Sequence, residues 1–202
     1  MPIVTAEYLT EVATTILEGG VVAIPTDTVY GLAALATSAG AMAGLADLKG
    51  REQQQPIAVL VDSVEAVAPY LEDPHALDAV ARFWPGALTA VVRARRDMPG
   101  GLAAPAVTEA GTIGVRIPDD DLARRVIRAL GGVLAVSSAN HHGEAPALSA
   151  AEVARMFGDD LLVLDGGERT GGVPSTVVDL TGDRPKVLRE GPVTAAMLGI
   201  EA

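Results

Sequence analysis

Short apolar runs alternate with helical patterns along the whole chain, and few folds accommodate elements in that order. Helices are predicted after the capping residues Thr5, Ser38 and Ser149, from about Ser63 and Pro74, and from the aspartates at 119–121. Strands are predicted over residues 21–24, 57–61, 87–92, 113–117, 133–136, 161–164, 176–180 and 186–188. This alternation indicates an α/β fold, and the closely spaced last strands indicate a twisted mixed sheet rather than a purely parallel one.

The chain of 202 residues shows no internal repeat and no linker, so a single domain over residues 1–202 is expected. Aromatic residues make up only 3% of it, so aliphatic side chains and alanine must form the core. We find neither a signal-peptide pattern nor an apolar run long enough to cross a bilayer. A cytoplasmic protein without membrane contact is therefore expected.

Charge and cysteine content exclude several classes of function. The formal net charge is −11, which argues against broad electrostatic binding to nucleic acid or anionic membranes but leaves room for a local basic pocket. With no cysteine, the chain has no disulfide, no thiolate metal site and no cysteine nucleophile. The Walker, dinucleotide-binding and nucleophile-elbow motifs are also absent. His141 and His142 are adjacent and lack the spacing of a helical metal pair, so an exposed loop is expected and no metal site.

The polar segment 25–31 follows a predicted buried strand and carries two hydroxyls, a carboxylate and a phenol. Pro25 ends the strand because proline has no N–H to donate to a ladder, and Gly31 allows the backbone to turn. In open α/β sheets, ligands bind beyond the carboxyl ends of strands, where this segment lies. Either a binding loop or an ordinary polar turn fits this pattern.

Cations beside apolar strands are a second indication of a binding site. Lys49 and Arg51 stand two apart on chain expected to be extended, so both side chains can point the same way. Arg116 and Arg189 lie at or next to apolar strands, where a guanidinium group can bind a carboxylate or phosphate through two hydrogen bonds. Pairing of each arginine with an internal carboxylate is an equally good interpretation.

Small hydrogen-bonding residues end or begin two further strands. Ser138 and Asn140 follow the strand at 133–136, and Ser175 precedes the strand at 176–180. Their side chains suit phosphate or ribose oxygens, although each could serve only as a turn or cap residue.

Seven short motifs occur in the order found in YrdC-type threonylcarbamoyl-AMP synthases, so the chain resembles that family. They are PTDTVYG at 25–31, KGR at 49–51, FWPG at 83–86, GVRIP at 114–118, SAN at 138–140, STVVD at 175–179 and LREG at 188–191. The motif-bearing core covers about residues 21–192, nearly the whole chain.

The resemblance implies a YrdC-like sheet with a large concave pocket and a nucleotidyltransferase activity. L-Threonine, bicarbonate and ATP would give threonylcarbamoyl-AMP and pyrophosphate, with Mg²⁺ carried by ATP. A separate tRNA threonylcarbamoyl transferase would receive the product, and direct tRNA binding would be weak or absent. By motif, the threonine-binding residues would be Thr28, Arg116 and Ser175. The nucleotide-binding residues would be Lys49, Arg51, Gln55, Thr112, Ser138, Asn140 and Arg189, with Lys49 and Arg51 catalytic through charge neutralisation.

Three positions depart from the family pattern. Leu60 replaces a common histidine on the threonine side, Gln55 a common asparagine, and Pro174 a frequent glutamate. These changes affect the geometry of the expected contacts rather than the reaction. Two other functions fit the concave, locally basic pocket: an RNA-binding module, and a carbamoyl-adenylate domain that serves metalloenzyme maturation.

Overall fold

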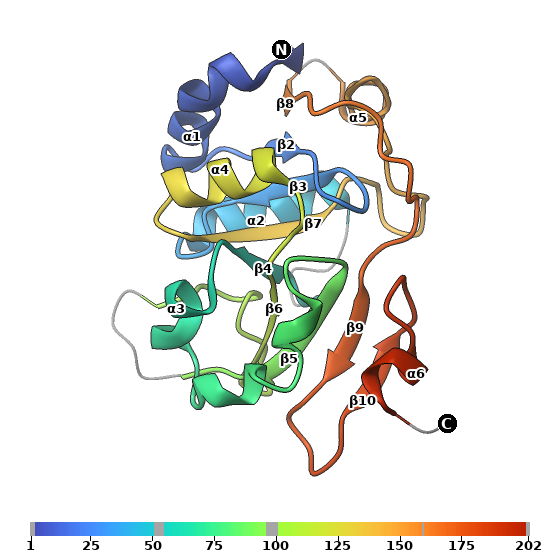
Figure 1. Ribbon diagram of the computed structural model, residues 1–202. Helices are drawn as coiled ribbons and strands as arrows, with labels where there is room; N and C mark the ends of the chain where they lie inside the picture. The colour runs from blue at the N-terminus through green and yellow to red at the C-terminus, as the bar shows by residue number, and fades with distance from the viewer. Residues whose placement is uncertain (1–2, 51–54, 96–100, 159, 201–202) are drawn as a thin grey trace.

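A computed structural model describes residues 3–50, 55–95, 101–158 and 160–200. Within these residues, ten strands form one twisted sheet flanked by helices (Figure 1). The strands are β1 (Ile3–Val4), β2 (Val22–Ile24), β3 (Gly31–Ala34), β4 (Ala58–Val61), β5 (Leu88–Arg93), β6 (Thr112–Arg116), β7 (Val133–Ser138), β8 (Leu162–Leu164), β9 (Thr176–Asp179) and β10 (Lys186–Arg189). The α-helices are α1 (Leu9–Leu17), α2 (Ala39–Lys49), α3 (Val64–Val67), α4 (Asp121–Ala129), α5 (Ala150–Phe157) and α6 (Ala195–Leu198). Short 3₁₀ turns occupy Ala6–Tyr8, Ala68–Tyr70, Pro74–Leu77 and Ala81–Phe83, so the helix expected from Pro74 is only a 3₁₀ turn.

The sheet is mixed, as the sequence predicted. Its order is β1-β8-β2-β3-β7-β4-β6-β5-β9-β10. The pairs β1·β8, β8·β2, β4·β6 and β5·β9 are parallel, and the other neighbouring pairs are antiparallel. Most strands that are consecutive in the sequence are adjacent in the sheet or have one strand between them, but β8 and β9 lie near opposite edges.

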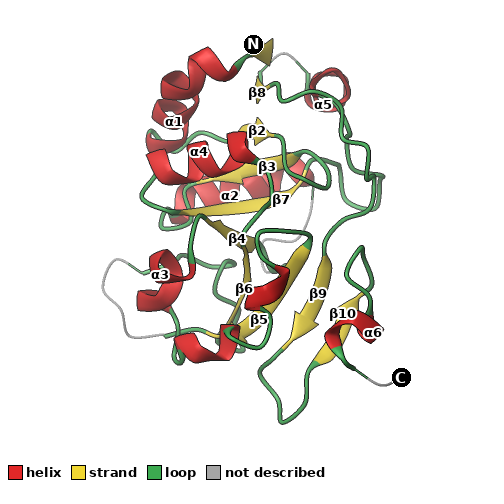
Figure 2. Ribbon diagram, in the orientation of Figure 1, coloured by secondary structure: helices red, strands yellow, loops and turns green. Residues whose placement is uncertain are grey.

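One half of the sheet is covered by helices on both faces. Val12 and Ile16 of α1 and Val126 and Ile127 of α4 pack with β2, β7 and β8 in one buried cluster. Helices α2 and α5 contribute to a second cluster on the opposite face. Figure 2 shows α1, α4 and α2 gathered around β2, β3 and β7, away from β9 and β10.

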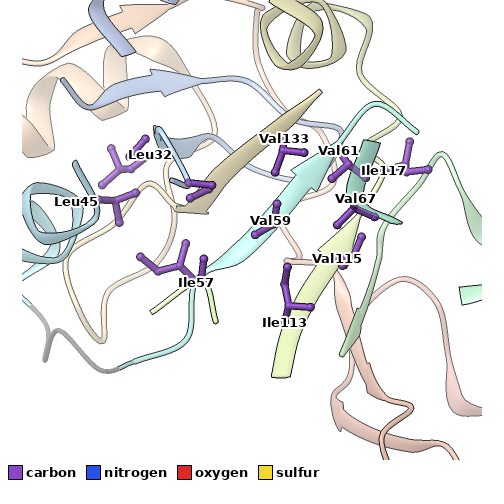
Figure 3. Packing of buried hydrophobic residues seen from close by; sticks show 14 of the residues in the cluster. Leu32, Leu45, Ile57, Val59, Val61, Val67, Ile113, Val115, Ile117 and Val133 are labelled. Carbon is purple, nitrogen blue, oxygen red and sulfur yellow. The ribbon is translucent and has the colours of Figure 1, made fainter. Parts of the chain in front are cut away.

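The other half of the sheet has only one face in the core. Along β5, Leu88, Ala90 and Val92 are buried in the larger cluster. Val59, Ile113 and Val115 of the neighbouring strands pack in the same cluster, as Figure 3 shows. Because side chains alternate across a strand, the residues between them face the opposite side. The cavity described below opens on that opposite side.

Helix ends follow the predicted caps, with one exception. Ser38, Asp120 and Ser149 each accept a hydrogen bond from a backbone N–H of the first turn. The prediction for Thr5 was wrong: its hydroxyl donates to Glu7 and makes no capping bond. Helix α2 ends at Gly50, which adopts the left-handed conformation (φ +62°) that favours glycine.

Three elements were not expected from the sequence: β1, β3 and α6. β1 has only two residues and α6 only four, and β3 begins at Gly31, which the sequence indicated as a turn residue. No helix among the described residues is long and apolar enough to span a membrane.

Candidate functional site

A cavity of about 700 Å³ opens on the uncovered face of the sheet. This volume lies within the range of sites that bind small molecules and cofactors. Eight of the predicted site residues line it: Thr28, Lys49, Thr112, Arg116, Ser138, Asn140, Ser175 and Arg189. Gln55 is not among its lining residues, and Arg51 lies outside the described residues.

Strand alternation builds the floor of the cavity. Thr112, Gly114 and Arg116 of β6 all line it, while Ile113 and Val115 between them are buried in the core. Thr89 and Val91 of β5 line it in the same way. At about 3.3 Å per residue, Thr112 and Arg116 stand roughly 13 Å apart, so the floor can hold an elongated ligand.

Arg116 is the most strongly held cation of the cavity and is only 5% exposed. Its Nη2 lies 2.6 Å from Asp27 Oδ1, its Nη1 donates to Thr28 Oγ1 at 3.1 Å, and its Nε donates to the Gly86 carbonyl. Burial lowers the pKa of the Arg116 guanidinium from its ordinary value, and the charge of Asp27 opposes that shift. The internal ion pair expected as an alternative is therefore present, and it lies beside a predicted ligand-binding hydroxyl.

The segment 25–31 is an ordered turn. Thr26 Oγ1 donates to the Val29 carbonyl at 2.6 Å and accepts from the backbone N–H of Thr28 and of Val29. It also lies 3.1 Å from Thr28 Oγ1. Thr26 and Thr28 are 4% and 3% exposed. The turn thus presents the Thr28 hydroxyl and Arg116 together at one end of the cavity.

Ser175 joins a second polar cluster at the cavity wall. Its Oγ lies 2.9 Å from Thr89 Oγ1 and accepts from Arg189 Nη2 at 3.2 Å. Arg189 also donates through Nε and Nη2 to the Ser175 carbonyl. Partial burial of the Arg189 guanidinium, and then the nearby charge of Arg116, lower its pKa. Arg116 and Arg189 both line the cavity, and guanidinium groups suit carboxylate or phosphate ligands.

Lys49, Ser138 and Asn140 form a third cluster. Lys49 is 4% exposed, and its Nζ donates to the Ser138 carbonyl at 2.5 Å, the Asn140 carbonyl at 3.0 Å and Asn140 Oδ1 at 3.1 Å. Ser138 Oγ donates to the same Oδ1 at 2.6 Å. The prediction of extended chain at Lys49 was wrong, because Lys49 ends helix α2 and Gly50 is left-handed. The structure nevertheless joins residues predicted from two separate motifs, KGR at 49–51 and SAN at 138–140.

The three departures from the family pattern have different locations. Leu60 lines the cavity and packs in the cluster under α1 and α4, so an apolar surface stands where the relatives' histidine would. Pro174 also lines the cavity, beside Ser175. Gln55 does not. Among the described residues, no group of three or more His, Asp or Glu side chains could hold a metal ion.

Sequence interpretation missed several polar residues of the cavity: Thr89, Thr108, His142, Asp179 and Thr181. Thr89 interrupts an otherwise apolar strand, and Asp179 follows Ser175 and Val177 at the two-residue spacing of one strand face. Those two positions carried a readable signal. Thr108 and His142 lie in loops, where no periodicity shows which way a side chain points.

Comparisons with known proteins agree on one family. The profile of the Sua5, YciO and YrdC proteins, described as telomere recombination, matches residues 14–191. A putative threonylcarbamoyl-AMP synthase of Mycobacterium tuberculosis is 38% identical over 91% of this chain and 86% of its own. The threonylcarbamoyl-AMP synthase of Pyrococcus abyssi is 38% identical over 87% of this chain and 52% of its own.

Solved structures agree with these sequences. The structure of P. abyssi Sua5 complexed with L-threonine has a TM-score of 0.83 and 33% identity, covering 95% of this chain and 58% of that one. Escherichia coli YciO has a TM-score of 0.82 at 24% identity, over 96% of this chain and 93% of its own, and shows the shared fold.

Proposed function

The chain belongs to the Sua5/YciO/YrdC family, and we propose on that basis that it is a threonylcarbamoyl-AMP synthase. It converts L-threonine, bicarbonate and ATP to threonylcarbamoyl-AMP and pyrophosphate. The observation that carries the proposal is the cavity itself, in which two arginines, a buried lysine and a row of small hydroxyls share one space. Such a site suits the assembly of several anions.

We assign the amino-acid end to Arg116, Thr28 and Ser175. The Arg116 guanidinium has five N–H donors, of which described neighbours take three, so donors remain for the threonine carboxylate. Asp27 pairs with Arg116 but is not itself a lining residue. The hydroxyls of Thr28 and Ser175 then face the threonine side chain.

We assign the nucleotide end to Lys49, Ser138, Asn140, Thr112 and Arg189. The Lys49 cluster would bind phosphate oxygens, with Arg51 as the further cation expected from the sequence. Arg189 lies next to Ser175, so it would stand where the two ligands meet. Gln55 does not line the cavity, and we leave it outside this set.

The reaction needs no protein nucleophile. The threonine amine attacks bicarbonate and expels water to form a carbamate, and a carbamate oxygen then attacks the α-phosphorus of ATP as pyrophosphate leaves. Both steps bring negatively charged groups together, so positioning and charge neutralisation are the contributions required of the protein. The cations of the cavity would supply that neutralisation.

Magnesium enters this proposal only as part of the substrate. The described residues offer no carboxylate cage, and Asp179 is the single acidic residue among those lining the cavity. Mg²⁺ usually keeps several waters and binds through substrate phosphates with one or two carboxylates. We therefore expect it to arrive bound to ATP.

Threonine-dependent pyrophosphate release from ATP and bicarbonate is the direct test. The wild-type chain should release pyrophosphate only with all three substrates present. Arg51→Ala should lower kcat/KM by roughly 10²-fold, the scale of losing one preorganised charge contact. Release that does not depend on threonine would refute the proposed activity, and a fully active Arg51→Ala variant would refute the role of Arg51 alone.

HypF, solved in a phosphate- and nucleotide-bound form, has a TM-score of 0.76 at 19% identity, over 91% of this chain and 29% of that one. At that identity the likeness shows the fold alone. The carbamoyl-adenylate activity considered as an alternative from the sequence would proceed from carbamoyl donors without threonine. The same assay separates the two functions.

We further propose that the product passes in the cytoplasm to a separate tRNA threonylcarbamoyl transferase. With a net charge of −11, this chain should bind tRNA only weakly and with strong salt dependence. A gel-shift titration at near-physiological salt tests this. Submicromolar binding by the chain alone would favour an RNA-binding module instead.

A further inference from the structure

The connection between β8 and β9 crosses the sheet, and we call residues 165–175 the strap. In Figure 1 this segment runs from the end of the molecule that carries β8 and α5 down to β9. It delivers Ser175 to the cavity wall. Gly166, Gly167, Gly171 and Gly172 interrupt it, so its backbone has few intrinsic restraints.

Arg169 is the residue that ties the strap to the body of the protein. Its Nη1 lies 2.8 Å from Asp120 Oδ2 and donates to the Thr26 carbonyl at 3.2 Å. The side chains of Arg169 and Asp120 are 14% and 13% exposed, so solvent screens this ion pair far less than a surface pair. Nη2 donates to the Gly166 carbonyl, and the Arg169 backbone N–H donates to the Leu148 carbonyl.

Tyr30 forms hydrogen bonds with the first part of the strap. Its Oη donates to the Gly167 carbonyl at 2.9 Å and accepts from the Gly166 N–H, and it lies 3.2 Å from Asp165 Oδ1. Burial raises the pKa of the Tyr30 phenol, which keeps it protonated as a donor. The Arg169 guanidinium lies 6.0 Å from the centre of the Tyr30 ring.

The second part of the strap is held at its far end only. Within the part of the chain that the structure describes, residues 170–174 make no hydrogen bond. The next hydrogen-bonded residues are Ser175, whose carbonyl accepts from Arg189, and Thr176, whose N–H donates to the Ala87 carbonyl. Arg169 is therefore the last fixed point before the Ser175 contact.

The loop that carries Thr28 lies between two arginines. On the outer side, Arg169 donates to the Thr26 carbonyl. Thr26 Oγ1 contacts Thr28 Oγ1, and Thr28 Oγ1 accepts from Arg116 on the cavity side. Arg169 is thus connected to Arg116, the predicted carboxylate-binding arginine, through the backbone and side chain of Thr26 and the hydroxyl of Thr28.

We propose that Arg169 is a positioning residue for the threonine end of the cavity. It does not line the cavity and touches no predicted ligand. It acts through two routes: the Thr26 carbonyl, which sets Thr28 and Arg116, and the strap, which sets Ser175. The inference rests on the proposed function, because it assigns these three residues to threonine. The hydrogen bonds of Arg169 run to Thr26, Asp120, Gly166 and Leu148 rather than to the Lys49 cluster, so we expect ATP binding to depend on Arg169 less than threonine binding does.

The test compares Arg169→Gln and Arg169→Lys with a matched control, Arg128→Gln. Arg128 also pairs with an aspartate, Asp62 at 3.4 Å, and neither residue lines the cavity. We expect Arg169→Gln to raise the KM for threonine roughly tenfold or more, the scale of a lost charge-assisted hydrogen bond. The KM for ATP should stay within about twofold, and Arg169→Lys, which keeps the charge but not the planar fork, should give an intermediate threonine KM. Arg128→Gln should change neither KM.

Calorimetric titration of L-threonine into the ATP-free protein gives a readout that does not need the reaction. Weaker threonine binding by Arg169→Gln, together with wild-type threonine binding by Arg128→Gln, supports the inference independently of the proposed reaction. Equal rises in both KM values, or unchanged threonine affinity in a folded Arg169→Gln protein, would overturn it. If Arg169→Gln does not fold, Asp120→Asn removes the partner charge while keeping an oxygen to cap α4, and it should raise the threonine KM by less. An unchanged threonine KM in both Asp120→Asn and Arg169→Lys would likewise overturn the inference.

Discussion

The two halves of the sheet use similar strands for different purposes. Around β2, β8 and the first part of β7, both faces are buried, because α1 and α4 cover one face and α2 and α5 the other. From β4 to β9, one face packs into the larger cluster and the opposite face lines the cavity. The site is therefore the part of one sheet face that no helix covers.

The difference is visible in the side chains that the uncovered face carries. Ala58, Thr89, Gly114 and Val177 are small, and they leave volume above the strands. On the covered half, the same face carries Ile24, Leu134 and Leu162, which fill the space under the helices. Residue size on one face thus separates structural strands from site strands, and substitutions in the two halves should have different consequences.

The largest expected effect is on stability, in the covered half. Ile16 of α1 is fully buried against β2 and α4. Ile16→Ala should lower the free energy of unfolding by about 2–5 kcal/mol, since it removes buried methyl groups and leaves a cavity. Denaturant unfolding measures the loss, and kcat/KM of the remaining folded protein should be unchanged. A large fall in kcat/KM at a temperature where the variant is folded would contradict the division into two halves.

In the open half of the sheet, from β4 to β9, Arg116→Lys should show the reverse pattern: a large loss of activity and a small loss of stability. Lysine keeps the positive charge beside Asp27 but loses the fork that reaches Gly86, Thr28 and Asp27 together. We expect kcat/KM for threonine to fall by roughly 10²-fold, with a smaller effect on stability than Ile16→Ala. Steady-state kinetics and denaturant unfolding on the same preparation test both parts. Unfolding as severe as that of Ile16→Ala would mean that Arg116 is chiefly structural.

The elements of the fold were more predictable than their arrangement. Apolar runs and caps predicted most strands and the long helices, because these signals are local in the sequence. The order β8-β2-β3-β7-β4 depends on pairings between distant segments, which no local pattern contains. The strand β3 escaped notice because Gly31 also ends the polar turn that precedes it.

The candidate site shows the same limit. Motif resemblance indicated eight residues that line one cavity, since each motif stands at the end of a strand or in a turn. It did not indicate the Asp27–Arg116 pair, the Thr89–Ser175 contact or Arg169, because these contacts join residues about 89, 86 and 143 positions apart. Nor did it show that Lys49 is helical, which depends on the left-handed Gly50.

Changing the amino-acid substrate tests the open half of the sheet without any mutation. If Thr28 and Ser175 face the substrate side chain, loss of the threonine methyl group removes only about 1–3 kcal/mol of discrimination. Serine should then be a substrate roughly 10–200-fold worse than threonine in kcat/KM. Valine, which lacks the hydroxyl, should be worse than serine because buried polar groups would be left unpaired. The apolar Leu60 at this end makes the comparison informative: valine outperforming serine would show that the cavity selects shape rather than the hydroxyl.

The smallest expected effect distinguishes the two faces of a single strand. Val91 and Val92 are neighbours on β5, but Val91 lines the cavity whereas Val92 is 1% exposed in the core. Valine to threonine changes little in shape and adds a hydroxyl, which costs about 1–3 kcal/mol when it is buried without a partner. Val92→Thr should therefore lower the free energy of unfolding by that amount, and Val91→Thr by less than about 0.5 kcal/mol, because water in the cavity can satisfy the new hydroxyl. Chemical denaturation of both variants against the wild type measures the difference without any assay of activity. Equal losses for the two would mean that the face of β5 assigned to the cavity is packed as tightly as the core.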